Sequence, residues 1–278
     1  MLRVSKDNPC PICGRPDWCL IAEDGSAAIC KRISEGSVKT AGDAGFLHIL
    51  KDRPLQQRRK YVKPSAPGPA INFEKLAADY RSGFKDPTGT AQMFGVSMAA
   101  LDQLLIGWDP EKKAHTFPMK DGRGNIIGIR LRTLDKHKFS VPGSKNGIFW
   151  PLSVKADAEE LLFIGEGPSD CAALLDLKFS PIGRASCGTG YQYIKKMIEH
   201  YKRQVIIIAD KDTAKFTPEG KKFFPGHEGA LKLARSIKPF VRSVRLIKPP
   251  DKKDIREWYQ AGATRAAVLY LVKNAKFI

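Results

Sequence analysis

The sequence lacks an apolar run long enough to cross a lipid bilayer, for which about 20 consecutive residues are needed. Its first ten residues, MLRVSKDNPC, also lack the apolar stretch of a secretory signal. Both absences argue against a membrane protein and against a secreted one. We therefore expect a cytoplasmic protein with no membrane partner, and its hydrophobic fraction of 42% supports a real core.

Acidic residues are scarce in comparison with basic ones. The 29 Asp and Glu residues face 47 Lys and Arg residues, which gives a formal net charge of +18. An excess of this size favours binding to a polyanion, most simply a nucleic acid. The alternative is a generally basic, solvated surface. Charge alone does not distinguish DNA from RNA, nor binding from catalysis.

Cysteine is nearly absent after residue 30. Four of the six cysteines lie before that point, and they are Cys10, Cys13, Cys19 and Cys30. The close C-x2-C pair, with Pro11 between its cysteines, is typical of a metal knuckle, and four thiolates around Zn²⁺ form a closed structural site. Disulfides are not expected in a cytoplasmic chain. Unrelated free thiols are the alternative.

The composition of the chain changes along its length and predicts four segments. Residues 1–50 form a zinc-binding ribbon, and residues 51–70, rich in Lys, Arg, Pro and Gln, form a basic linker. Residues 71–155 form a subdomain, with a helix expected over 71–81, short helices over 91–108 and a hairpin over 113–134. Residues 156–278 form the last domain.

Short apolar runs alternate with helical patterns from residue 160 onward. The runs are LLFIGE, SPIGRAS, QVIIIAD and SVRLIKP, and the helical patterns between them include SDCAALLDL, GYQYIKKMIEHY and GHEGALKLARSI. Strands that alternate with helices predict a parallel sheet with helices on its faces. The fold class expected is therefore α/β.

Acidic residues follow the expected strands. Glu166 ends the first strand, Asp210 and Asp212 follow the third, and Asp251 and Asp254 follow the fourth. Ligands of open parallel sheets bind at the carboxyl ends of the strands, so these acids should meet at one edge. Crowded carboxylates repel one another, and a divalent cation such as Mg²⁺ relieves the repulsion. Ordinary caps and turns are the alternative, and Asp170 either caps the next helix or lies outside the metal ligands.

These stretches resemble the TOPRIM domains of bacterial primases and topoisomerases. GEGPSDCAAL (165–174) resembles the first TOPRIM motif, ADKD (209–212) the DxD motif, ASCGTG (185–190) the AxxGT segment of DnaG-type primases, and PPDKKDIREW (249–258) their later acidic segment. The resemblance implies that Glu166, Asp210 and Asp212 hold catalytic Mg²⁺ or Mn²⁺. It also implies that Asp170 and Asp254 complete the acidic site.

The resemblance extends upstream of the acids and to the N-terminus. Residues 104–152 are similar to the half of the primase core that precedes TOPRIM, which implies phosphate contacts for Arg132, Lys138 and Lys145; solvated strand charges are the alternative for each. DnaG-type primases also begin with a zinc ribbon, usually with one His ligand, whereas here all four ligands are Cys. Within this module Trp18, Lys31 and Arg32 are candidates to contact single-stranded DNA, although Trp18 also suits a filler role.

The resemblance thus implies a TOPRIM domain behind an α+β primase-core subdomain and a zinc ribbon. The implied activity is that of a primase, a nucleotidyltransferase that makes short RNA primers from ribonucleoside triphosphates on a single-stranded DNA template. We expect a phage, plasmid or other mobile-element origin, a location at the nucleoid or replication fork, and any replicative helicase to be supplied in trans.

Two features leave alternatives open. A zinc ribbon with TOPRIM also occurs in recombination mediators, which bind DNA without polymerising, and TOPRIM nucleases use similar acids to cut. In addition, the stretch 213–225 is an insertion relative to the family pattern. It is a lid, a template contact or a surface excursion.

Overall fold

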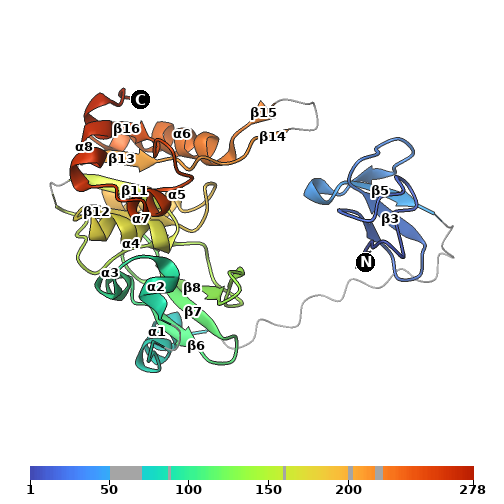
Figure 1. The fold of residues 1–278 in the computed structure, drawn as a ribbon, viewed down its shortest axis with the longest axis horizontal. Helices are drawn as coiled ribbons and strands as arrows, with labels where there is room; N and C mark the ends of the chain where they lie inside the picture. Colours follow the sequence, from blue (N-terminus) through green and yellow to red (C-terminus); the bar gives the residue numbers. More distant parts are fainter. Residues whose placement is uncertain (51–70, 87–88, 159–160, 200–202, 217–221) are drawn as a thin grey trace. The chain divides into compact units, whose positions relative to one another are not determined.

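The computed structural model describes residues 1–50, 71–86, 89–158, 161–199, 203–216 and 222–278, and the expected linker 51–70 lies outside them. The chain divides into two compact units, Met1–Pro69 and Ala70–Ile278, which are described separately (Figure 1). Within the described ranges, no helix is long and apolar enough to cross a membrane. The four-segment division predicted from composition stays a prediction.

The first unit is a small antiparallel sheet with very little core. Its strands run in the order β1-β2-β3-β5-β4. They are β1 (Leu2–Arg3), β2 (Leu20–Ile21), β3 (Ala27–Cys30), β4 (Lys39–Thr40) and β5 (Phe46–Ile49), with a short 3₁₀ helix at Gly42–Ala44. Its buried cluster consists of Val4 and three cysteines, Cys10, Cys19 and Cys30. A unit with so few buried apolar groups needs a metal or another staple to be stable.

The second unit is built on one sheet in the order β16-β13-β11-β12-β10-β7-β8-β9, with β6 paired to β7. Its first four strands are parallel and are β11 (Leu162–Glu166), β12 (Ser180–Arg184), β13 (Gln204–Ile208) and β16 (Ser243–Ile247). The rest are antiparallel and are β6 (Gly107–Asp109), β7 (Ala114–Lys120), β8 (Ile126–Thr133), β9 (Lys138–Ser140) and β10 (Ile148–Phe149). The short strand β10 joins the two halves because it pairs with both β7 and β12.

Helices cover both faces of the parallel half, as its apolar strands require. The helices are α4 (Pro168–Asp176), α5 (Tyr191–Ile198), α6 (Pro225–Ile237), α7 (Ile255–Gln260) and α8 (Arg265–Asn274). A short 3₁₀ helix, Lys238–Phe240, directly follows α6. One buried cluster joins the strands to α5 and α6. A second buried cluster contains the alternate strand residues, which point to the other face of the sheet, and it joins the strands to α4, α7 and α8.

Three short helices pack with the antiparallel half. They are α1 (Phe73–Ser82), α2 (Thr90–Phe94) and α3 (Met98–Gln103). Side chains of α2, α3 and β7 share a buried cluster with Cys171 and its neighbours on α4. The two halves of the second unit therefore have a common core as well as a common sheet.

Most of the elements expected from periodicity are present. The helix expected over 71–81, the short helices within 91–108, the hairpin of 113–134 and the four strands after residue 160 all form. The insertion 213–225 contains a separate two-stranded ribbon of β14 (Lys215–Phe216) and β15 (Lys222–Phe223), which the sequence did not predict.

Candidate functional site

The acids that end the parallel strands lie at one edge of the sheet. Glu166 is the last residue of β11, and Asp210 comes two residues after the end of β13. These strands are parallel neighbours, with Ile164 opposite Ile207, so their carboxyl ends meet. The backbone after Glu166 turns at Gly167, whose φ of 97° is left-handed and favours glycine.

Asp170 lies inside the first turn of α4 and is almost completely buried. A Cβ placed on Gly165 would lie 3.2 Å from the Cβ of Asp170, so the glycine leaves room for this side chain above β11. The N-cap of α4 is Gly167, without a side-chain cap, so the capping alternative for Asp170 is wrong. Its Oδ1 atom is buried without a hydrogen-bond partner among the described residues. An orphaned carboxylate oxygen of this kind suits a cation.

The buried acids raise one another's pKa values. Burial, followed by the charges of Glu166 and Asp254, raises the pKa of Asp210 to about 7. Burial and the charge of Asp210 raise the pKa of Asp170 well above its ordinary value. Burial also raises the pKa of Glu166, although the guanidinium of Arg184 opposes it. Carboxylates from distant parts of the sequence thus share one electrostatic site.

Asp212 and Asp254 belong to the same site but also have structural partners. Asp212 Oδ2 accepts a hydrogen bond of 2.7 Å from the Gly226 amide at the start of α6, and its charge contributes to the raised pKa values of Glu166 and Asp210. Asp254 caps α7 by accepting from the Glu257 amide at 2.7 Å. Asp251, by contrast, is exposed, and it is not one of the main charges that shift the pKa values of these acids.

Cations surround the acids, and two of the predicted ones are among them. The carboxylates of Asp170 and Asp254 favour the charged form of Arg132 on β8, and the carboxylate of Asp170 favours the charged form of Lys138 on β9. Burial and neighbouring acids still raise the pKa values of Asp170 and Asp210, but the cation of Arg256 partly opposes the rise at Asp170, and that of Lys253 the rise at Asp210. Sequence reasoning missed Arg256, although it lies two residues after Asp254 and approaches it to 4.0 Å.

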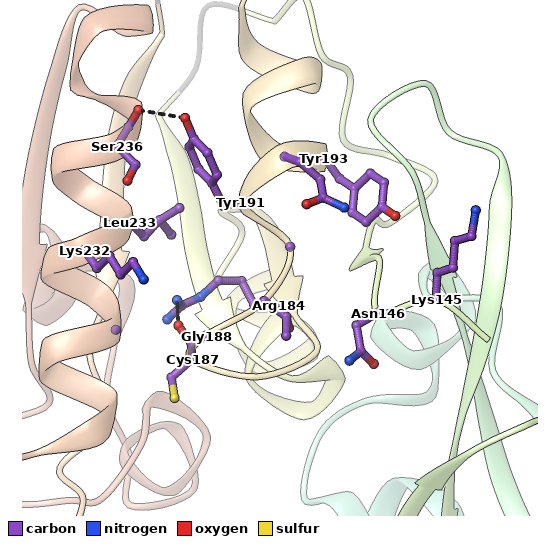
Figure 2. Close-up of a pocket in the computed structure, with 14 residues that line it drawn as sticks. Lys145, Asn146, Arg184, Cys187, Gly188, Tyr191, Tyr193, Lys232, Leu233 and Ser236 are labelled. Carbon is purple, nitrogen blue, oxygen red and sulfur yellow. Dashed lines mark hydrogen bonds between the residues drawn. The ribbon is translucent and has the colours of Figure 1, made fainter. Parts of the chain in front are cut away.

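The third predicted cation, Lys145, lies elsewhere. It lines a cavity of about 570 Å³ together with Arg184, Cys187 and Lys232 (Figure 2). Arg184 is 1% exposed and was not predicted as a functional residue, because a single Arg in the apolar run SPIGRAS has no sequence signal of its own. Cys171 is buried in the core, whereas Cys187 is half-buried at the cavity wall.

The carboxylates fit a cation such as Mg²⁺ that keeps part of its water shell, rather than one fully enclosed by protein ligands. Within the described part of the chain, the four N-terminal cysteines form the one group of three or more ligands whose atoms already lie close together. Mg²⁺ is commonly held by one or two carboxylates, with waters and substrate phosphates completing its shell. The mutual repulsion of the buried acids and the orphaned Asp170 oxygen are consistent with such an ion.

The cysteine cluster brings four possible metal ligands together. The sulfur atoms of Cys10, Cys13, Cys19 and Cys30 all lie within 4.8 Å of one another. The amides of Lys31 and Ile33 donate to the sulfurs of Cys19 and Cys30, both at 3.3 Å. Such N–H···S bonds orient the thiolates of a structural zinc site. The arrangement fits Zn²⁺ bound by four thiolates.

The three candidate DNA contacts of this module differ in their availability. Trp18 is 76% exposed, so it is not a core filler. Arg32 forms an ion pair with Asp17 at 2.8 Å and also reaches the sulfur of Cys19. The Lys31 ammonium donates to the carbonyl oxygen of Asp43. Trp18 is therefore the most available of the three, and contacts to DNA stay a prediction for all of them.

The chain is similar to solved structures of bacterial primases. No family model and no curated protein matches it. Its TM-score is 0.56 with the E. coli primase catalytic core, at 16% identity over 74% of this chain and 79% of that one. It is 0.57 with a DnaG primase catalytic domain bound to single-stranded DNA, at 17% identity over 74% and 78%. For an Aquifex aeolicus primase with zinc-binding and RNA polymerase domains, the score is 0.58 at 12% identity over 74% and 60%.

At these identities the similarity establishes the fold. The second unit has the architecture of a DnaG primase catalytic core, with a mixed sheet whose parallel half carries the acids. It follows a four-cysteine module in the chain. The predicted resemblance and the predicted α/β fold class are both confirmed at this level.

Proposed function

We propose that this protein is a primase that makes short RNA primers on a single-stranded DNA template. The observation that carries the proposal is a set of five acids whose charges act on one another near the carboxyl edge of a primase-type sheet, with basic side chains whose charges act on them. Acids with cations beside them suit chemistry on phosphate esters, where metal ions and lysine or arginine share the work. One of the similar structures is bound to single-stranded DNA, which supports the choice of template.

In this proposal Glu166, Asp210 and Asp212 would hold Mg²⁺ or Mn²⁺, and Asp170 and Asp254 would complete the negative field. The bound ions would stabilise negative charge on the α-phosphate and on the leaving pyrophosphate. The protein's own contribution would be positioning, because the parallel pairing of β11 and β13 brings the strand ends that carry Glu166 and Asp210 side by side. Arg132 and Lys138 would hold phosphate groups opposite the acids.

In the N-terminal unit the four cysteines would hold one Zn²⁺, and the exposed Trp18 would stack on a template base. A replicative helicase acting in trans, a mobile-element origin and a location at the replication fork stay predictions.

A template assay tests this function. The protein is incubated with Mg²⁺ or Mn²⁺, labelled ribonucleoside triphosphates and single-stranded DNA, and the products are separated by length. We expect oligoribonucleotides from the wild type and from Asp251→Asn, which removes an exposed acid outside the site. We expect at least a hundredfold less product from Asp210→Asn, because the ligand charge is lost. DNA cleavage without RNA product would indicate a nuclease, and unchanged DNA binding without any product would indicate a recombination mediator.

A further inference from the structure

The cavity of about 570 Å³ in the second unit is not explained by the acid site, although it adjoins it. Arg184 is one of the residues that line it and is the in-register neighbour of Glu166 across β11 and β12. A Cβ on Gly229 of α6 would lie 2.6 Å from the carbonyl oxygen of Cys187, so helix and loop are in close contact at one wall. Its volume falls within the range of about 300–1,000 Å³ that is typical of ligand pockets.

The charge of the cavity lining is entirely positive. Among the described residues that line it, Arg184, Lys145 and Lys232 carry charges and no carboxylate is present. In Figure 2, Lys232 extends from α6 toward the loop that contains Cys187 and Gly188, and the side chain of Arg184 reaches the same loop. A concave surface lined by one sign of charge concentrates counter-ions of the other sign.

Arg184 is a buried cation whose hydrogen bonds are incomplete. Its side chain is 1% exposed, and Nη1 donates to the Cys187 carbonyl oxygen at 2.7 Å. Its Nε is buried and has no partner within the described residues. A buried donor without an acceptor costs free energy unless it serves a ligand or holds a needed geometry. Here the guanidinium holds the loop that leads into α5, and its charge also acts on the neighbouring Glu166.

The start of α5 adds backbone donors to this cavity. Its N-cap is Gly190, which has a left-handed φ of 83° and no side-chain cap. The amides of Tyr191 and Gln192 donate to no acceptor in the part of the chain that the structure describes. Unpaired amides at a helix N-terminus favour an oxyanion, and the helix dipole acts in the same direction. Both residues line the cavity.

We propose that this cavity is a phosphate-binding subsite, in which the α5 amides, Lys232 and Lys145 bind phosphate oxygens over the buried charge of Arg184. The phosphates come either from the polyphosphate tail of a nucleotide or from a nucleic-acid backbone. The phosphate chemistry follows from the lining alone. Only the link to a nucleotide or a nucleic acid rests on the proposed function.

Calorimetric titration with inorganic pyrophosphate tests the subsite. The zinc-loaded full chain is titrated without Mg²⁺ or Mn²⁺, so that metal at the acid cluster cannot contribute to binding. We expect saturable binding that Lys232→Gln weakens about tenfold, because a charge-assisted hydrogen bond is lost. Arg235→Gln is the matched control: it removes an exposed charge from the same helix, outside the cavity lining, and should change the affinity less than about twofold.

Arg184→Gln should weaken pyrophosphate binding at least as much as Lys232→Gln, provided that circular dichroism shows a folded protein; otherwise Lys232→Gln decides. Absence of pyrophosphate binding, or equal effects of Lys232→Gln and Arg235→Gln, would overturn the subsite. If only a ribonucleoside triphosphate competes with pyrophosphate, the subsite binds the polyphosphate tail of a nucleotide. If a DNA oligonucleotide without a terminal phosphate competes, the subsite binds the nucleic-acid backbone. Because no primer is made in this titration, a protein that binds pyrophosphate but makes no RNA refutes the proposed function and leaves the subsite intact.

Discussion

At the scale of single residues, burial decides which charge state is stable. Asp210 and His115 are opposite cases, since burial raises the pKa of the acid to about 7 and lowers that of the imidazole to about 4. His115 is fully buried on β7, with Nε2 at 2.8 Å from Thr90 Oγ1 and the rings of Phe94 and Trp108 edge-on against it. Such a site holds the neutral ring.

The stability of the second unit should therefore fall in mild acid because of His115. Well above a pH of about 6.5, the imidazole is neutral in both the folded and the unfolded chain. As the pH falls, the unfolded chain binds a proton first, whereas the folded chain binds it only near pH 4, so stability is lost between these values. The free energy of unfolding falls by up to about 3 kcal/mol in total, because each unit of difference between the folded and unfolded pKa values corresponds to about 1.4 kcal/mol.

Urea unfolding of the wild type and of His115→Gln at a series of pH values measures this loss. The difference in free energy of unfolding between the two proteins should shrink as the pH falls from about 7 to about 4. All other titrating groups are common to both proteins and cancel. A difference that stays constant with pH would show that His115 takes up its proton equally in both states.

Trp18 is expected to contribute to binding of single-stranded DNA but not to the stability of its unit. Its φ is 64°, a left-handed conformation that asparagine adopts more easily than tryptophan, and its ring is 76% exposed. Trp18→Asn should leave the module as stable as before or slightly more stable. Its affinity for single-stranded DNA, measured by fluorescence anisotropy, should fall about fivefold or more as base stacking is lost. Val38→Asn, at another exposed apolar position of this unit, should leave the affinity unchanged; equal losses would assign no special role to Trp18.

At the scale of elements, the strands and their acidic ends were predictable and the loops between them were not. The apolar runs of β11 and β13 are long enough to show buried parallel strands, and the position of acids at strand ends follows from sheet geometry. The role of Arg184 was not predictable, because it depends on the register that sets it beside Glu166. The internal partners of Lys31 and Arg32 depend likewise on how the cysteine loops fold back.

The N-terminal unit gives a prediction about zinc. Its own buried cluster is mainly cysteine, so metal binding should supply most of its folding energy. One Zn²⁺ per chain is expected by atomic emission, and Cys13→Ser should lose it. Calorimetry should then lose the transition of this unit, while the transition of the second unit, which has separate buried clusters, keeps its midpoint. Full zinc content in Cys13→Ser would reject the four-thiolate site.

At the scale of the whole molecule, the central feature is one sheet that gathers acids from residues 166 to 254. Glu166, Asp170, Asp210 and Asp254 influence one another's charge although α4, α5 and α6 separate them in the sequence. The sequence could predict this edge because parallel strands align their carboxyl ends. It could not predict that the antiparallel half continues the same sheet through β10, which brings Lys138 and Arg132 opposite the acids.

The most direct test of the central claim is a Mn²⁺ titration followed by electron paramagnetic resonance, in which bound ions lose the signal of free Mn²⁺. The wild type and Asp251→Asn should bind Mn²⁺ alike, and more tightly as the pH rises through about 7, because Asp210 must lose its proton to serve as a ligand. Asp210→Asn should bind at least about tenfold more weakly. Equal Mn²⁺ binding by wild type and Asp210→Asn would contradict a shared metal site among these acids.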